Sequence, residues 1–94
     1  IEYIKSEHIY CNLYLTDGQE FLLRESMKAL EDRLEAVGFI KIFRGCLVNM
    51  EQVEEMKNGK VYMHGGTVLQ ISSRLKASVE KKYTSFCIEN ARFC

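Results

Sequence analysis

The middle of the chain reads Gly-Phe-Ile-Lys-Ile-Phe-Arg-Gly-Cys-Leu-Val-Asn-Met from Gly38 to Met50. We expect a short strand over Phe39 to Ile42, followed by an exposed corner at Arg44-Gly45. The chain then returns through an apolar turn at Leu47-Val48, which Asn49 closes. Because predicted rigid elements flank this corner on both sides, Arg44 is well placed to contact a ligand.

The segment before this stretch begins with three predicted strands, Ile1 to Lys5, Ile9 to Leu15 and Glu20 to Leu23. Apolar and polar side chains alternate in the second strand with a period of two, as expected for a half-buried strand. A polar turn at Ser6-Glu7-His8 separates the first two strands. The Asp-Gly pair at Asp17-Gly18 favours a tight hairpin turn before the third.

The clearest predicted helix covers residues 26 to 37, where apolar side chains recur at three- and four-residue steps. Ser26 is a suitable N-cap and Gly38 a suitable residue just past the C-terminus. The remaining faces are mostly charged, so this helix is expected to be scaffold.

Further hairpins follow, with strands expected over Gln52 to Met56, Val61 to His64 and Thr67 to Ile71. The turns between them contain Asn58-Gly59 and Gly65-Gly66. Three tight turns in a chain of this size predict a mainly β, antiparallel domain.

A second helix is predicted to open at Ser72-Ser73-Arg74, where either serine could cap it, and to continue through Phe86. Its apolar side chains again recur at helical spacing. The tail from Cys87 to Cys94 shows no pattern, so we expect one domain over residues 1–94 with its core in residues 1–86.

The amino-acid composition excludes fewer classes of function than the order of the residues does. Ninety-four residues correspond to one domain, and a first residue other than Met suggests excision from a longer chain. Thirteen basic and thirteen acidic residues give no overall attraction to nucleic acid, so binding would need clustered cations. No apolar run is long enough to span a membrane. The four cysteines form no closely spaced pair, which favours reduced thiols.

Catalytic and metal chemistry has little support in the sequence. The two histidines, His8 and His64, stand alone, without the closely spaced ligands that zinc requires. No glycine-rich phosphate loop is present. A small hydrolase that pairs Cys46 or Cys87 with a histidine remains an alternative without a local signature.

Three predicted corners carry polar or basic groups: Glu7-His8-Ile9, Arg44-Gly45 and Ser72-Ser73-Arg74. Arginine reads guanine through two hydrogen bonds in the major groove, and lysine, serine and helix N-termini hold phosphates. The residues alone leave two alternatives open, a joint binding surface and three unrelated surface loops.

The sequence resembles the LytTR DNA-binding domain, an output module of bacterial response regulators, over residues 1 to 86. The most specific segment, Phe39 to Asn49, resembles the family pattern F-x-R-x-H-R-S-x-x-V-N. Leu69 to Arg74 resembles its closing L-P-[IV]-S-R-R. Two further segments fit in the same order: the opening Ile1 to Ser6 and the helical Arg24 to Glu31.

The resemblance implies an elongated arrangement of small antiparallel β-sheets with one or two short helices. In this family, loops enter successive major grooves of double-stranded DNA. The contacts carried over by position are His8, Ile9, Arg44, Gly45, Ser73 and Arg74, with Lys76 as a further phosphate contact. The resemblance also implies a cytoplasmic regulator without catalysis or cofactor, an upstream receiver domain, and a dimer on a pair of direct repeats.

Several positions depart from the family pattern, so the base preference is expected to differ. Phe43 replaces the usual histidine, Gly45 the usual serine, and Ser73 a frequent arginine. Ile9 stands where asparagine or histidine is common. A protein-interaction module on the same β scaffold is the alternative function.

Overall fold

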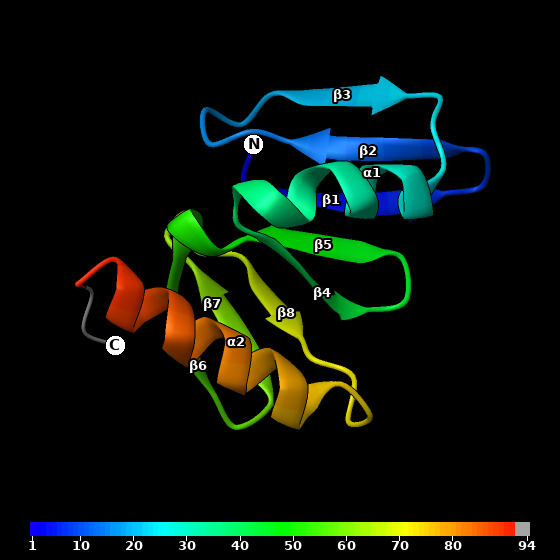
Figure 1. Cartoon of the computed structure of the whole chain (residues 1–94). Coiled ribbons are helices and arrows are strands. Elements are labelled where there is room, and N and C mark those ends of the chain that lie inside the picture. Colours follow the sequence, from blue (N-terminus) through cyan, green and yellow to red (C-terminus); the bar gives the residue numbers. More distant parts are fainter. Residues whose placement is uncertain (92–94) are drawn as a thin grey trace.

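Two antiparallel sheets and two α-helices make up the computed structural model, which describes residues 1–91 (Figure 1). The mainly β prediction is confirmed. The molecule is modestly elongated, with principal extents of 35 × 29 × 23 Å. The first sheet has the strand order β3-β2-β1-β5-β4, from β1 (Tyr3–Glu7), β2 (Tyr10–Tyr14), β3 (Glu20–Leu23), β4 (Phe39–Phe43) and β5 (Cys46–Asn49). The second has the order β6-β7-β8, from β6 (Val53–Lys57), β7 (Lys60–Met63) and β8 (Val68–Gln70).

Strand β5 corrects the prediction of an apolar turn at Leu47-Val48. It pairs with β1 on one side and with β4 on the other, and Ile4 lies opposite Leu47. Leu47 and Val48 point to opposite faces of the sheet, and both are fully buried, with 1% and 0% of their surfaces exposed. A strand inside a sheet buries two apolar neighbours on two faces, which a surface turn cannot do.

Helix α1 (Met27–Leu34) covers one face of the first sheet. The Ser26 hydroxyl accepts a hydrogen bond from the Ala29 amide at 3.1 Å, so the predicted N-cap is confirmed. A 3₁₀ turn, η1 (Glu35–Val37), extends the helix, and Gly38 ends it with φ of 96°. Leu30 packs in a cluster with four buried residues of the sheet, Ile4, Cys11, Phe39 and Leu47.

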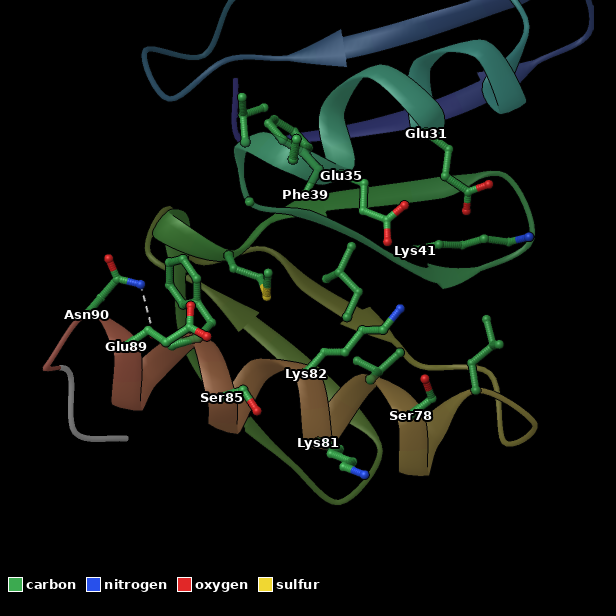
Figure 2. A pocket seen from close by; sticks show the side chains of 18 residues that line it. Glu31, Glu35, Phe39, Lys41, Ser78, Lys81, Lys82, Ser85, Glu89 and Asn90 are labelled. Atoms are coloured by element: carbon green, nitrogen blue, oxygen red, sulfur yellow. Dashed lines mark hydrogen bonds between the residues drawn. The ribbon is translucent and has the colours of Figure 1, made fainter.

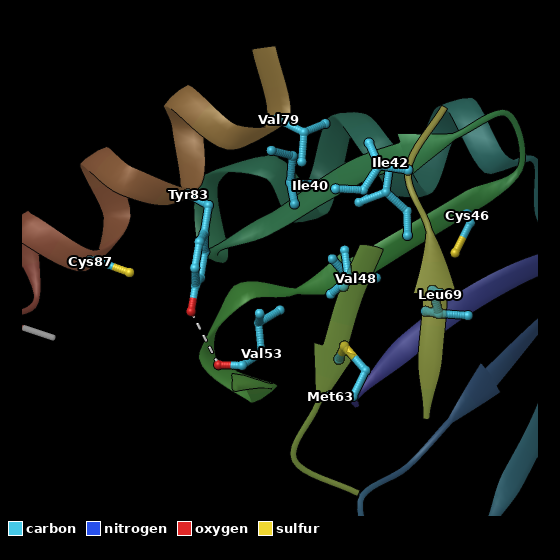
Figure 3. Close-up of a cluster of buried hydrophobic side chains, with 12 residues drawn as sticks. Ile40, Ile42, Cys46, Val48, Val53, Met63, Leu69, Val79, Tyr83 and Cys87 are labelled. Atoms are coloured by element: carbon cyan, nitrogen blue, oxygen red, sulfur yellow. Dashed lines mark hydrogen bonds between the residues drawn. The ribbon is translucent and has the colours of Figure 1, made fainter. Parts of the chain in front are cut away.

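The larger core lies on the opposite face of the first sheet, between β4, β5, the second sheet and helix α2 (Lys76–Glu89) (Figure 3). A second 3₁₀ turn, η2 (Met50–Gln52), leads from the first sheet into the second. Tyr83 of α2 donates a hydrogen bond from its hydroxyl to the Val53 carbonyl at 3.3 Å (Figure 3). Both sheets and α2 therefore share one apolar interior.

Helix α2 differs from its prediction at both ends. It begins at Lys76, with Leu75 at the N-cap position and no side-chain cap, so neither serine caps it. It continues to Glu89, which places Cys87 inside the helix rather than in a tail without pattern. Residues 92–94, including Cys94, lie outside the described part of the chain.

Candidate nucleic-acid interface

The first corner is a two-residue turn, His8-Ile9, between β1 and β2 (Figure 1). The prediction placed this turn one to two residues earlier, but β1 continues through Glu7, which pairs with Tyr10. His8 adopts φ of 56°, a left-handed conformation typical of tight hairpin turns. Both turn side chains are exposed, and Ile9 has 60% of its surface in contact with solvent.

The second corner is Arg44-Gly45, which joins β4 to β5. Arg44 is exposed. Gly45 has φ of 83°, and a Cβ built on it would collide with the Ser6 Oγ. Only glycine fits this position without moving Ser6, so the turn packs directly on the end of β1.

The third corner, Ser73-Arg74, lies in the turn between β8 and α2. Both residues are exposed and precede the first helical residue, Lys76, which is also exposed. The Leu75 amide donates to the Ser72 carbonyl at 2.9 Å, which closes the turn. The expected placement of Ser73-Arg74 at the helix start is therefore corrected by two to three residues.

Two backbone hydrogen bonds tie together the segments that carry the three corners. The Ser6 amide of β1, two residues before the first corner, donates to the Gly45 carbonyl of the second corner at 2.8 Å. The Ser72 amide, directly before the third corner, donates to the Ile42 carbonyl of β4 at 2.8 Å. In Figure 1 all three corners lie along the right-hand side of the molecule. The turns that carry the predicted site residues therefore lie toward one side of the molecule.

Two further cations lie close to this row of corners and were missed in the sequence. Lys5 is half-buried on β1, opposite Cys46, with its Nζ 5.9 Å from the centre of the Tyr3 ring. Lys41 is half-buried on β4, and its amino group points toward the β4–β5 end of the sheet (Figure 2). Lys41 occupies the first arginine position of the family pattern, a signal that could have identified it. No comparable signal marks Lys5.

The cysteines do not form a catalytic arrangement with the histidines in residues 1–91. Cys46 is fully buried and Cys87 has 6% of its surface exposed, whereas His8 and His64 are exposed in turns. Burial raises the pKa of the Cys46 thiol from its ordinary value of 9.0 to about 12, and the Lys5 ammonium lowers it by a smaller amount. A buried, protonated thiol is a poor nucleophile.

We expect native Cys46 to resist alkylation by iodoacetamide at pH 8, and to react once the chain is unfolded.

The stability of the fold should also depend on the protonation of Cys46. Because the pKa of this thiol is higher in the folded chain than in the unfolded chain, the stabilising effect of the buried thiol is complete below pH 9 and is lost as the pH rises from 9 toward 12. At pH 10 the loss is about 1 kcal/mol. Urea denaturation of the wild type and of Cys46→Ala at pH 7 and pH 10 measures this loss in the free energy of unfolding. An equal loss in both proteins would contradict the assignment.

A groove of about 1110 Å³ separates α2 from α1 and β4 (Figure 2). One side carries the carboxylates of Glu31 of α1 and Glu35 of η1, and the α2 side carries Lys81 and Lys82. The mixed charge gives no clear preference for an anionic ligand. Within the described residues, no three His, Cys, Asp or Glu side chains are grouped so that they could hold a metal ion. Neither helix in this part of the chain has the length and apolarity needed to cross a membrane.

Comparisons with known proteins identify the family and the fold. A family model described as the LytTr DNA-binding domain matches residues 1–84. An uncharacterised response regulatory protein of Vibrio cholerae is 34% identical over 68 residues, which are 66% of this chain and 26% of that protein. The chain therefore spans about a quarter of that relative. A solved LytTr DNA-binding domain from a Bacillus cereus methyl-accepting/DNA response regulator superposes with a TM-score of 0.73 at 17% identity, covering 89% of this chain and 80% of that one. That superposition shows a shared fold.

Proposed function

Because this chain belongs to the LytTR DNA-binding domain family, we propose that it binds a specific double-stranded DNA sequence as the output domain of a bacterial response regulator. The binding regulates transcription, and the domain carries out no catalysis of its own. The observation that carries the proposal is the row of three exposed corners, connected by two backbone hydrogen bonds, on one side of a molecule with zero net charge.

The size of the molecule supports contact with two successive major grooves. Its longest extent is 35 Å, and one turn of B-DNA is about 34–36 Å long. A molecule of this length is therefore large enough for loops on one of its sides to contact both grooves. Arg44 reads a guanine, since its guanidinium is exposed at the middle corner.

The other corner residues receive different roles. His8 and Ile9 contact base edges or a thymine methyl, and Ser73 and Arg74 contact bases or phosphates in the next groove. Lys76, together with Lys5 and Lys41, holds phosphates. Gly45 contributes through its backbone, because its tight packing against Ser6 sets the direction of the turn.

The remaining features of the proposal concern the context of the domain. One domain spans residues 1–94, with its core in residues 1–86. An upstream receiver domain controls it, and two copies bind a pair of direct repeats in the cytoplasm. The response regulatory protein of Vibrio cholerae, almost four times as long as the region it shares with this chain, supports this arrangement.

Selection of bound duplexes from a random pool, followed by a salt titration on the selected site, tests the proposal. Phosphate contacts release counterions, so log Kd should rise linearly with log salt, by about 0.9 for each phosphate neutralised. Substituting Lys76 with alanine should lower this slope by about 1. Absence of any selected duplex, or an affinity that does not change with salt, would favour the protein-interaction module instead.

A further inference from the structure

The outer edge of β3 is unpaired and carries three apolar side chains. β3 is an edge strand, and no other strand in residues 1–91 pairs with its free side (Figure 1). Phe21, Leu22 and Leu23 have 54%, 63% and 37% of their surfaces exposed. Natural proteins usually protect such an edge with charges, proline or a covering element, so an open apolar edge indicates a partner.

The ladder between β2 and β3 determines which backbone groups are free. The Leu15 amide donates to the Gln19 carbonyl at 2.9 Å, and hydrogen-bonded pairs recur every second residue along an antiparallel ladder. Leu13 opposite Phe21, and Cys11 opposite Leu23, are therefore the bonded pairs. The N–H and C=O groups of Leu22 consequently point outward, away from β2.

The residues around Leu22 are self-complementary when two copies are placed antiparallel. With Leu22 opposite Leu22 of a second copy, Phe21 faces Leu23 on each side of the centre, and Glu20 faces Arg24, the residue directly after β3. This register pairs the two outward-facing Leu22 backbones and joins opposite charges twice. Arg24 has no ion pair among the described residues, since the two ion pairs formed there are Arg33–Glu25 and Lys57–Glu55.

We propose that two copies of this chain associate through β3, with a two-fold axis through Leu22, to form one continuous ten-stranded sheet. The contact involves about five residues per copy, so it buries less surface than the roughly 800 Å² per partner of a stable interface. The pair is therefore weak and concentration-dependent. This association does not depend on DNA and does not rest on the proposed function.

The geometry distinguishes this pair from two copies bound side by side on one duplex. Antiparallel pairing reverses the strand direction of the second copy, and the three corners lie at one end of the strands (Figure 1). The corners of the two copies therefore point in opposite directions. Such a pair can hold two duplexes, or two distant parts of one, but cannot bind adjacent sites on a straight duplex with both copies.

Sedimentation under reducing conditions, over about 10 µM to 1 mM protein, tests the association. Wild type should shift from monomer to dimer as the concentration rises. Arg24→Glu and Glu20→Arg should each weaken this shift at least about tenfold, because each variant places like charges opposite one another. Lys81→Glu, an exposed reversal on α2, is the matched control and should behave as wild type.

Exchanging the two charges should restore dimerisation, which makes the test specific for the Glu20–Arg24 pairs. An equimolar mixture of Arg24→Glu and Glu20→Arg should form heterodimers, and the double variant should self-associate again. Amide exchange should slow with concentration at Leu22 but not at Phe21 or Leu23, which already bond to β2. A monomer at all concentrations, equal association of the single variants and wild type, or no restoration in the mixture would each overturn the proposal. DNA binding, measured on dilute protein, reports separately on the proposed function.

Discussion

Substituting Arg44 with alanine is expected to weaken binding to the selected DNA site by about 5- to 150-fold, which corresponds to the 1–3 kcal/mol of a good guanine contact. Arg44 is exposed at the middle corner, so its substitution should remove the proposed contact to DNA and little else. The melting temperature should stay within about 3 °C of wild type, as for other surface substitutions. A gel-shift titration and a thermal melt measure the two quantities.

Two further variants separate the contributions of Arg44. Arg44→Lys keeps the positive charge but not the planar fork, so it should recover phosphate attraction with a weaker guanine preference. Arg33→Ala removes an exposed arginine of α1 that is paired with Glu25, and it should leave DNA affinity unchanged. Equal binding by wild type and Arg44→Ala would show that the wrong corner has been assigned. Unfolding of Arg44→Ala would instead make Arg44 structural.

Substituting Gly45 with alanine is expected to lower the free energy of unfolding by about 2–3 kcal/mol and to lower DNA affinity as well. Two effects combine in this loss. A residue with a Cβ is strained at φ of 83°, and the new methyl group collides with the Ser6 Oγ. Urea denaturation measures the stability, and the change in affinity reports how far the corner moves.

The chain contains a control for each of these two effects. Gly59 has φ of 72°, and a Cβ added there would meet no atom within 4 Å, so Gly59→Ala measures the backbone strain alone, about 1–2 kcal/mol. Ser6→Ala in the Gly45→Ala background removes the colliding oxygen and should recover the remainder. If Gly45→Ala costs no more than Gly59→Ala, the contact with Ser6 does not position the corner.

Local signals in the sequence predicted most of the fold. The Asn58-Gly59 and Gly65-Gly66 pairs marked their hairpins, since few other residues adopt the turn conformations required. Ser26 and Gly38 marked the two ends of the first helix through capping. Each of these signals depends on a few neighbouring residues, so no knowledge of tertiary structure was needed.

The errors have non-local causes. Leu47-Val48 could be an apolar turn or a buried strand, and the choice was made by pairing with β1, more than forty residues earlier. Ser72 and Ser73 had the composition of a helix cap, but neither caps the helix, which begins at Lys76. Ser72 is instead held against β4, where its amide donates to the Ile42 carbonyl. The prediction could not show that the three corners share one side, because two long-range backbone bonds bring them together.

The bonds at Ser6 and Ser72 also have a consequence for the choice of DNA. They join the backbone beside the corners through peptide groups rather than through long side chains, so the distances between the proposed DNA contacts are fixed before DNA binds. The three corners therefore keep a constant spacing. One extra base pair between two recognised groups displaces the second by about 3.4 Å along the axis and also rotates it around the duplex. A rigid arrangement of corners cannot follow this displacement. The domain should therefore select the number of base pairs between two recognised groups as strictly as it selects the bases themselves.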